Sequence, residues 1–390
     1  MANLSVAMIV KNEEKHLAKC LESIKPVAEE IVIVDTGSTD KTVEVAKKYT
    51  DKVYHHDWED GYFSGARNYG LKFVTKRWVL WIDADEWIYP EGYKEVEQVC
   101  NRGDIYAIFC GLLSDLPDGR LSKHFLPKFF RRGSAHFKGI VHNQLVHADP
   151  TFVSKINFHH VGYALAPDIL AAKRKRTTGL LKKQIKKNKK DGFAYMNISR
   201  TMMNDGKHKE ALEMAEKGLA VKASGPGKEM LYYSIAMCAG FLKDYERAEE
   251  ACWDALSLNP QNLDMTFLLG TNAIAQKQWG KGIFYLNRYL QLKESEDSQN
   301  NLNFLIVDFW EARDRAYQII GACYKNLDKK EKALEYLRKS VKMSPHNPMF
   351  LRNLALCYED NGHMSHAKHI WYEMAQKGFV DNMVLERLNK

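Results

Sequence analysis

The sequence predicts an α/β domain followed by an all-α solenoid, and two observations support this division. In residues 1–160, short apolar stretches alternate with amphipathic ones, as expected for a mostly parallel sheet with helices on both faces. In residues 191–390 the pattern changes to helical periodicity with a recurrence at 34 residues. We therefore expect an α/β domain at 1–166, a basic helical linker at 167–190 and a repeat domain at 191–390.

In the first domain, polar residues are predicted to gather at the ends of the strands. The expected strands are LSVAMIV, EEIVIVDTGS, DKVYHH and RWVLWIDAD, and the helices between them are NEEKHLAKCLESI, TDKTVEVAKKYT and SGARNYGLKFVTK. Residues 11–13 follow the first strand, Asp35 closes the second, and Asp83 and Asp85 close the fourth. Ligands of parallel sheets bind beyond the carboxyl ends of the strands, so this pattern predicts a binding site at that edge.

The second domain is predicted from small residues that recur at one spacing. Gly321 and Ala333 are followed, 34 residues later, by Ala355 and Ala367, at positions where two helices must approach closely. This period resembles the tetratricopeptide repeat and implies about five helix pairs stacked as a solenoid. The spacing breaks once, after Gly282, where QLKESEDSQNNLNFLIVD is expected to be an inserted loop or a lengthened helix.

The segment WVLWIDADEW places the carboxylates of Asp83, Asp85 and Glu86 directly after a strongly apolar strand. Side chains at i and i+2 of a strand point the same way, so Asp83 and Asp85 are expected to converge on one point. Such a pair can bind a hard cation such as Mn²⁺ or Mg²⁺, perform acid–base chemistry or simply be solvated. The apolar strand argues against solvation. No glycine-rich phosphate loop is present, so a metal ion is the expected neutraliser of a diphosphate.

Four segments in succession resemble the motifs of family-2 glycosyltransferases: VAMIVKNEEKHLAKCLESI, EEIVIVDTGSTDKTVEVA, FSGARNYGL and WVLWIDADEW. The later segments KFFRRGSAHFKGIVHNQL and FHHVGY are similar to a subgroup that joins this domain to tetratricopeptide-like repeats, and that includes sublancin-type peptide S-glycosyltransferases. The resemblance implies a nucleotide-sugar-binding GT-A domain with an Asp-x-Asp metal motif. It also implies an inverting transfer of a sugar, a hexose from a UDP-sugar, to a Cys, Ser or Thr side chain of a peptide or protein.

The resemblance also implies a set of nucleotide-sugar-binding residues. Asp35 would contact the uracil or ribose, and Arg67 would support the nucleotide. Arg176 would hold the pyrophosphate. The remaining members of this set are Val10, Asn12, Glu13, Asp83 and Ala84.

The metal ligands implied by the resemblance lie in two segments far apart in the sequence. Asp85 would ligate the metal, and Asp83 would contact the ribose or a metal-bound water. His160, in the arrangement H-x-G-Y, would be a third ligand or a diphosphate contact, with its neighbour His159 as an alternative.

The general base is expected near residue 142. Relatives show His-Glu in the segment that reads Val141-His142-Asn143 here, so a carboxylate at position 143 is missing. An unperturbed histidine side chain titrates near neutrality, so His142 is the expected base, with Asp115 and Glu86 as alternatives. A cysteine acceptor would need less assistance, because a thiol ionises more easily than a hydroxyl.

Two other functions remain open from the sequence. The acceptor could be a cell-surface saccharide or a lipid, and a different class of function is a non-catalytic repeat scaffold or a nucleic-acid binder. Residues 173–190 hold ten Lys or Arg and no acid, which allows nucleic-acid binding, but carboxylates at successive strand ends disfavour this role. We expect the repeats to hold the acceptor or to pair two copies into a homodimer.

Composition points to a cytoplasmic protein. No apolar run reaches the ~20 residues of a membrane span, and no signal peptide is evident. The seven cysteines are scattered without a CxxC pair, so we expect reduced, buried thiols.

Overall fold

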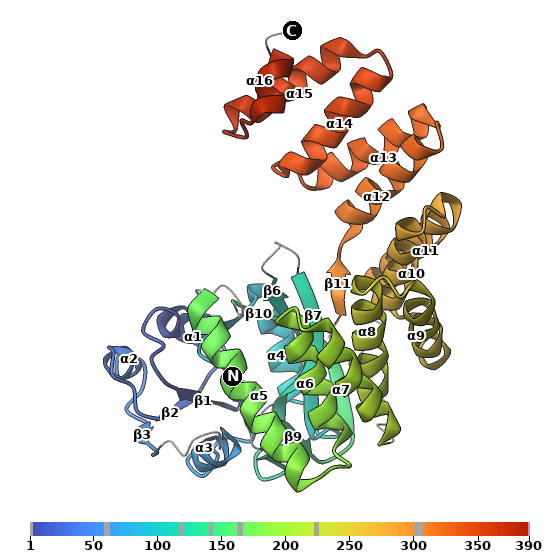
Figure 1. Ribbon diagram of the computed structural model, residues 1–390. Helices are drawn as coiled ribbons and strands as arrows, with labels where there is room; N and C mark the ends of the chain where they lie inside the picture. The colour runs from blue at the N-terminus through green and yellow to red at the C-terminus, as the bar shows by residue number, and fades with distance from the viewer. Residues whose placement is uncertain are drawn as a thin grey trace. The chain divides into compact units, whose positions relative to one another are not determined.

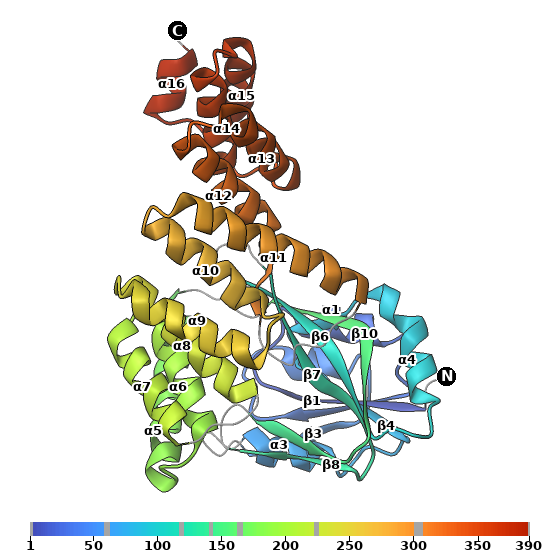
Figure 2. The same cartoon turned by 90° about the vertical axis from the view of Figure 1, so that its right-hand side faces the viewer.

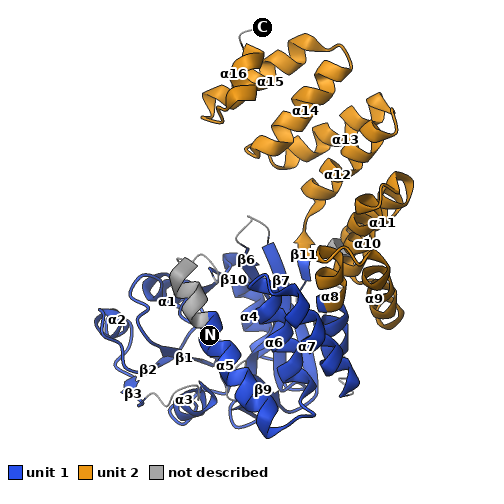
Figure 3. Ribbon diagram, in the orientation of Figure 1, with its two compact units in different colours: residues 1–234, 300–308 blue, residues 235–299, 309–390 orange. Residues whose placement is uncertain are grey.

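The structure is a computed structural model that describes residues 3–57, 63–116, 121–139, 143–161, 167–221, 226–299 and 307–388. The chain divides into two compact units (Figure 3). Unit 1 holds residues 1–234 and 300–308, and unit 2 holds 235–299 and 309–390. Unit 1 therefore includes the first helices of the predicted repeat region. The domain boundaries at 166 and 190 rest on sequence pattern and stay predictions.

Unit 1 is built on a mixed β-sheet. In the described residues its strand order is β3-β2-β1-β4-β7-β6-β10-β5, with β11 (Val307–Glu311) paired to β7. The first four strands are parallel to one another: β1 (Leu4–Val10), β2 (Glu30–Asp35), β3 (Val53–His55) and β4 (Trp78–Trp81). A separate ribbon is formed by β8 (Ala135–Lys138) and β9 (Gln144–His147).

The prediction of a mostly parallel sheet is correct for these four strands and for β10, which is parallel to β6, but β7 and β5 run antiparallel to their neighbours. The strands β6 (Ala107–Asp115) and β7 (Leu121–Arg131) form a long hairpin, and β7 pairs antiparallel with β4. Figure 2 shows this hairpin beside β10 (Thr151–His160). The last strand of the path, β5 (Glu86–Ile88), is antiparallel to β10. Hairpins need only a short connection, whereas parallel pairs need a crossover, so the local pairing of β6 with β7 overrides the helix–strand alternation.

The central strand β1 is buried on both sides, which explains its almost continuous apolar sequence. Leu4, Val6 and Met8 pack into a cluster with α1 (Leu17–Ile24) and α4 (Tyr93–Cys100), and Ala7 packs into a second cluster on the other face. On the described chain α3 (Phe63–Gly70) contacts β1 and β2, and α2 (Thr42–Ala46) contacts α1.

This topology brings several strand ends to one edge of the sheet. Strand β7 is antiparallel to both β4 and β6, so β6 runs in the same direction as β4, and β10 is parallel to β6. The carboxyl ends of β1, β2, β4, β6 and β10 therefore share one edge. Val10, Asp35, Asp115 and His160 are the last residues of four of these strands.

The helical region follows the predicted repeat. In the described residues it begins with α5 (Pro167–Lys187) and continues as five successive helix pairs, which confirms the prediction (Figure 1). The pairs are α6 (Gly192–Asn204) with α7 (His208–Ala220), α8 (Pro226–Phe241) with α9 (Tyr245–Leu258), α10 (Leu263–Ala275) with α11 (Trp279–Gln299), α12 (Arg313–Asn326) with α13 (Lys330–Met343), and α14 (Pro348–Asp360) with α15 (Met364–Gln376). A final helix, α16 (Asn382–Leu388), contacts α15.

The break in the repeat is explained by a long helix and a strand. Helix α11 extends to Gln299, as one of the two predicted alternatives requires, and β11 begins at Val307. Residues 300–306 lie outside the described part of the chain.

The small residues of the repeat lie where paired helices approach closely. A Cβ atom at Gly282 of α11 would meet Ile274 of α10, with Cδ1 only 2.9 Å away, and would lie 3.3 Å from the carbonyl oxygen of Gly270. A Cβ at Gly280, one half-turn earlier, would meet nothing within 4 Å. A close contact between helices therefore requires glycine at position 282, whereas no packing contact requires it at position 280.

Gly282→Ala is expected to destabilise unit 2 by about 1–3 kcal/mol, because the added methyl overpacks the α10–α11 interface. Gly280→Ala is the matched control and is expected to stabilise by about 0.5–1 kcal/mol through helix propensity. Urea unfolding monitored by circular dichroism measures both. Equal effects of the two substitutions would contradict the assignment of Gly282 to a close helix contact.

All seven cysteines are buried, as predicted, and the structure describes them as free thiols. Within the described ranges, no helix combines the length and the apolar character that crossing a membrane requires.

Candidate functional site

The two aspartates of the Asp-x-Asp pair lie in a tight turn. Strand β4 ends at Trp81 and β5 begins at Glu86, and the turn is closed by a hydrogen bond of 3.1 Å from the Glu86 N–H to the Asp83 carbonyl oxygen. Strand alternation therefore does not apply to Asp83 and Asp85, because the chain leaves the strand before Asp83.

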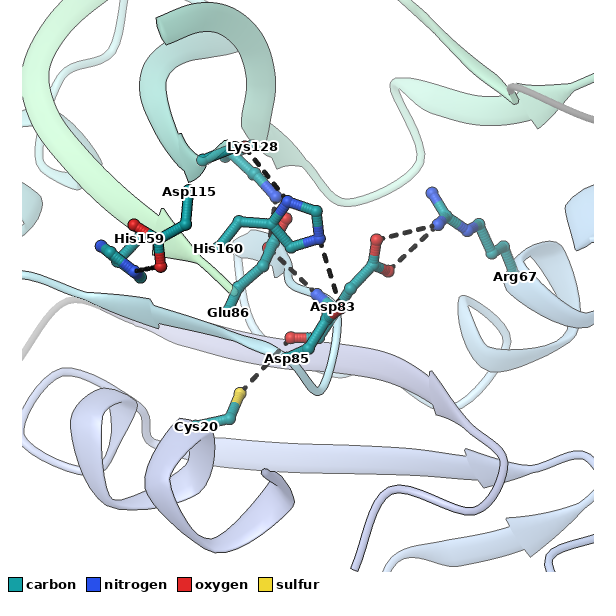
Figure 4. A network of polar contacts seen from close by, with 10 residues as sticks. Cys20, Arg67, Asp83, Asp85, Glu86, Asp115, Lys128, His159 and His160 are labelled. Carbon is teal, nitrogen blue, oxygen red and sulfur yellow. Dashed lines mark hydrogen bonds and ion pairs between the residues drawn. The ribbon is translucent and has the colours of Figure 1, made fainter. Parts of the chain in front are cut away.

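The carboxylates of Asp83 and Asp85 face different cationic partners (Figure 4). Asp83 Oδ1 lies 3.0 Å from Arg67 Nη2, and Asp85 Oδ2 lies 3.2 Å from His160 Nε2. The Asp83 side chain is 41% exposed, so one side of this ion pair is open to solvent and to a ligand. The predicted residues Arg67, Asp83, Asp85 and His160 thus form one continuous group at the carboxyl edge of the sheet.

Glu86 stabilises the turn that contains Asp83 and Asp85. Its Oε2 accepts a hydrogen bond of 3.1 Å from the Asp83 N–H and pairs with the Lys128 ammonium, and the residue is only 2% exposed. Burial raises the pKa of Glu86, the charge of Asp83 raises it further, and Lys128 opposes both. A carboxylate this deeply buried and paired suits a structural role better than the alternative role of general base.

His160 is held from both ring nitrogens. Nδ1 lies 3.1 Å from the Ser114 hydroxyl, and Nε2 faces Asp85. Burial lowers the pKa of His160, but the hydrogen bond to Asp85 and the neighbouring carboxylates outweigh it and leave the pKa above its ordinary value. The ring is therefore oriented toward the carboxylate that the sequence assigns to a metal.

The residues present partly fit a divalent cation. Asp85 and His160 offer one oxygen and one nitrogen ligand at a common point, and Mn²⁺ accepts such a mixed donor set. Asp83 does not join them, because it faces Arg67. Among the described residues, no group of three His, Cys, Asp or Glu side chains has the arrangement of a metal site.

Arg67 is fixed by aromatic neighbours. Its guanidinium carbon lies 5.4 Å from the ring centre of Trp81 and 5.1 Å from that of Phe137. Nη2 reaches Asp83, whereas Nε is buried and has no hydrogen-bond partner within the described chain. An arginine oriented in this way can bind an anionic ligand at the edge of the site.

Arg176 of α5 reaches the same part of unit 1. Its guanidinium carbon lies 6.0 Å from the ring of Phe63, the first residue of the helix that carries Arg67, and its side chain is exposed. Arg176, which the resemblance assigns to the pyrophosphate, therefore lies beside α3.

Asn12 ties together the loops that follow β1 and β2. Its backbone is left-handed, with φ of 58°, and its Oδ1 accepts a hydrogen bond of 2.8 Å from the Thr39 N–H. The Asn12 N–H donates to Ser38 Oγ at 3.0 Å, and the Glu13 N–H donates to Thr42 Oγ1 at 2.7 Å. Asn12 therefore acts on this edge by fixing the shape of two loops.

Asp35 stabilises the turn after β2. Its carboxylate accepts hydrogen bonds of 3.1 Å from the backbone N–H groups of Gly37 and Ser38, and the residue is buried. Val10 and Ala84 are buried as well, so a ligand could reach only their backbone groups.

His159 belongs to a separate network. Its Nε2 lies 2.9 Å from Asp115 Oδ2, its Nδ1 lies 2.8 Å from the Tyr89 hydroxyl, and its ring stacks on Trp87 with centres 4.2 Å apart. Adjacent residues of a strand point to opposite faces, so only one of the two histidines can meet Asp85. That histidine is His160. From sequence alone, the alternation indicates that the two histidines face opposite ways but not which of them meets Asp85.

Two residues that the sequence did not assign support the site: Lys128, which pairs with Glu86, and Ser114, which orients His160. The predicted base His142 lies outside the described residues, as do Gly162 and Tyr163 of the H-x-G-Y arrangement.

Comparison with protein-family models identifies both parts of the chain. Residues 5–145 match the model for glycosyl transferase family 2, and residues 231–262 and 314–347 match the tetratricopeptide repeat. Among solved structures, the chain is similar to YrrB, a tetratricopeptide-repeat protein with an unusual peptide-binding site. The TM-score is 0.39 and the identity 20%, over 52% of this chain and 94% of that one.

Curated relatives match parts of the chain. Over 131 residues, the chain is 35% identical to a TPR repeat-containing protein of Synechococcus elongatus. This match covers 34% of this chain and 32% of the relative. It is 26% identical over 224 residues to the SPbeta prophage-derived glycosyltransferase SunS of Bacillus subtilis, covering 55% and 53%. An uncharacterized glycosyltransferase of Rickettsia typhi is 30% identical over 40% of this chain and 56% of its own length.

The chain thus spans between a third and somewhat more than half of the length of these relatives. The family matches agree with the fold class and the resemblance predicted from the sequence. Residues 5–145 are thus similar to glycosyl transferase family 2, and two later segments of the chain are similar to the tetratricopeptide repeat.

Proposed function

We propose that the protein is a metal-dependent, inverting glycosyltransferase that moves a hexose from a UDP-sugar to a Cys, Ser or Thr side chain of a peptide or protein. One observation carries this proposal: within a family 2 domain, Arg67, Asp83, Asp85 and His160 adjoin at the carboxyl edge of the sheet. The names of the SunS and Rickettsia relatives support the reaction class.

A bound Mn²⁺ or Mg²⁺ would be held by Asp85 and His160 and would supply positive charge to the departing nucleoside diphosphate. Asp83, fixed by Arg67, would contact the ribose or a metal-bound water. Lys128 and Glu86 would keep the Asp83–Asp85 turn in place.

The protein's own cations and loops would orient the donor. Arg67 and the exposed Arg176 would bind the diphosphate, since guanidinium groups pair well with phosphate oxygens. The loops joined by Asn12, together with Asp35, would form the wall of the nucleotide pocket. The acceptor oxygen or sulfur would lose its proton to a base and attack the anomeric carbon from the face opposite the diphosphate.

The repeats would hold the acceptor chain. Unit 2 contains an apolar pocket of about 340 Å³ between α8, α9 and α10, lined by Met237, Phe241, Tyr245 and Phe267 among others. A pocket of this size and character fits an apolar side chain of a bound polypeptide. The exposed Phe241 at its rim would be available for such a contact.

A donor screen tests the proposal directly. The full chain is mixed with Mn²⁺ and, in turn, each common nucleotide-sugar, and the released nucleoside diphosphate is measured. We expect release from one UDP-hexose, loss of release when a chelator removes the metal, and recovery when Mn²⁺ is restored. No release from any donor, with or without thiol- and hydroxyl-bearing peptides, would refute the proposal.

The base is tested by His142→Ala. If His142 accepts the acceptor's proton, turnover is expected to fall about 10²-fold while nucleotide binding is retained. His136→Ala is the matched control, because His136 is an exposed histidine on β8 of the same domain. Steady-state kinetics and isothermal titration with UDP separate the two effects. Unchanged turnover would remove His142 from the mechanism.

A further inference from the structure

Helix α5 concentrates the positive charge of the chain. Residues 173–190 contain ten Lys or Arg and no acid, whereas the other 372 residues contain 47 Lys and Arg against 49 Asp and Glu. The formal net charge of +8 therefore originates in this one segment. Such a localised charge calls for a physical explanation that overall composition does not supply.

The cations of α5 form a stripe along one face of the helix. The basic stripe consists of exposed side chains at helical spacing: Lys175, Arg176, Lys182, Lys183, Lys186 and Lys187. Helix α5 contacts α6, and Leu181, on the face opposite the stripe, is fully buried. From residue 175 to residue 187 the stripe is about 18 Å long.

The basic stripe is unfavourable for the isolated helix. Lys182 and Lys183 each lie four residues before another lysine, Lys186 and Lys187, and like charges at this spacing destabilise a helix. The last-turn position favours Lys186 and Lys187 through the helix dipole, but it does not explain the earlier cations. Over the described ranges, none of the six pairs with a carboxylate of the chain. An external anion would relieve the repulsion.

Gly179 lies in the middle of the basic stripe. It is exposed, and a Cβ atom there would meet nothing within 4 Å, so no packing contact requires glycine at this position. Glycine inside a helix costs about 1 kcal/mol relative to alanine. A gap between the cations lets another polypeptide backbone approach the helix closely.

The basic stripe leads toward the proposed donor site. Arg176, near its N-terminal end, lies beside Phe63 of α3, the helix whose Arg67 contacts Asp83. A ligand lying along the stripe would therefore have one end near the reacting residues. This placement fits a substrate better than a partner that binds the protein elsewhere.

We propose that the lysines of the basic stripe, with Arg176 left to the diphosphate, bind an acidic segment of the acceptor polypeptide, about five or six residues in extended form. The nature of the occupant rests on the proposed function. A lipid surface is disfavoured because the stripe carries no exposed aromatic or leucine side chain to insert. A nucleic-acid single strand is disfavoured because residues 173–190 contain no aromatic residue for stacking.

Direct binding tests the basic stripe without catalysis. A fluorescein-labelled peptide alternating Glu and Gly is titrated with the full chain, and its anisotropy is compared with that of a Gln–Gly peptide. The variant K182E/K183E/K186E is expected to bind the Glu peptide at least tenfold more weakly. The control K25E/K47E/K48E reverses three other exposed lysines of unit 1 and is expected to bind like the wild type.

Two further variants test the role of Gly179. Gly179→Glu places a carboxylate within the stripe and is expected to weaken binding of the Glu peptide, whereas Gly179→Ala keeps the charge unchanged and serves as its control. Circular dichroism establishes that each variant remains folded. Equal binding of the Glu peptide by wild type and the triple variant would overturn the proposal, and so would the absence of binding to the wild type.

Transfer assays connect the basic stripe to the reaction. A peptide with an acidic block, a spacer and a Cys-Gly-Ser end is compared with its Gln-block version, and KM is expected to be about tenfold lower for the acidic peptide with wild type only. If no peptide is glycosylated, the proposed function fails while the anisotropy result still stands for the stripe. Tighter binding of a short DNA duplex or of phosphatidylserine vesicles through the same lysines would overturn the acceptor assignment.

Discussion

Asp85→Ala is expected to reduce nucleotide-sugar turnover about 10²–10³-fold, the range seen when one group that stabilises developing charge is removed. Asp85 faces His160 at 3.2 Å, and the substitution removes the carboxylate that pairs with that imidazole. The fold should survive, because the turn is held by the backbone of Asp83 and by Glu86 rather than by the Asp85 carboxylate.

The measurement is the release of nucleoside diphosphate across a titration of Mn²⁺. A loss of affinity for the metal would appear as a shift of the midpoint to higher Mn²⁺, which separates metal binding from damage to the fold. Asp51→Ala, at an exposed aspartate of the same domain, is the control and is expected to behave as the wild type. Wild-type turnover by the Asp85 variant would exclude Asp85 as a metal ligand.

The sequence predicted the location of the site better than its geometry. Because ligand-facing residues lie at strand ends in α/β sheets, Asp83 and Asp85, and with the family resemblance Arg67 and His160, could be assigned to one site before the fold was known. Their pairing could not. Strand alternation predicts that Asp83 and Asp85 converge, but the chain turns after Trp81 and directs them to different partners.

The supporting residues were missed because they depend on long-range pairing. Lys128 and Glu86 are 42 residues apart and come together only when the β6–β7 hairpin joins the sheet. Nothing in the local sequence of either residue indicates this partner. The repeat region was easier to predict, because each helix pair contacts mainly its neighbours and the 34-residue period expresses those contacts locally.

Lys128→Met is expected to destabilise unit 1 by about 3–5 kcal/mol at neutral pH, because it leaves the Glu86 carboxylate buried without its counter-charge. The double variant Lys128→Met/Glu86→Gln should recover most of this loss, since the glutamine amide oxygen can still accept the Asp83 N–H. Lys94→Met, at an exposed lysine of α4, controls for the substitution itself.

The effect of Lys128→Met should depend on pH in a defined direction. Burial already raises the pKa of Glu86, and removing Lys128 raises it further. A carboxyl group whose pKa is higher in the folded state binds its proton more tightly there, so stability falls as pH rises from the ordinary glutamate value of about 4.3 through the raised value. The Lys128→Met variant should therefore lose less stability at pH near 4 than at neutral pH.

Urea unfolding at several pH values measures this dependence, and the double variant should lack it. A Lys128→Met protein as stable as the Lys94→Met control at neutral pH would show that Glu86 does not rely on Lys128. If instead the variant loses stability and also binds UDP more weakly in Mn²⁺, the buried pair beneath the turn determines the position of Asp83 and Asp85, and through them the shape of the proposed donor site.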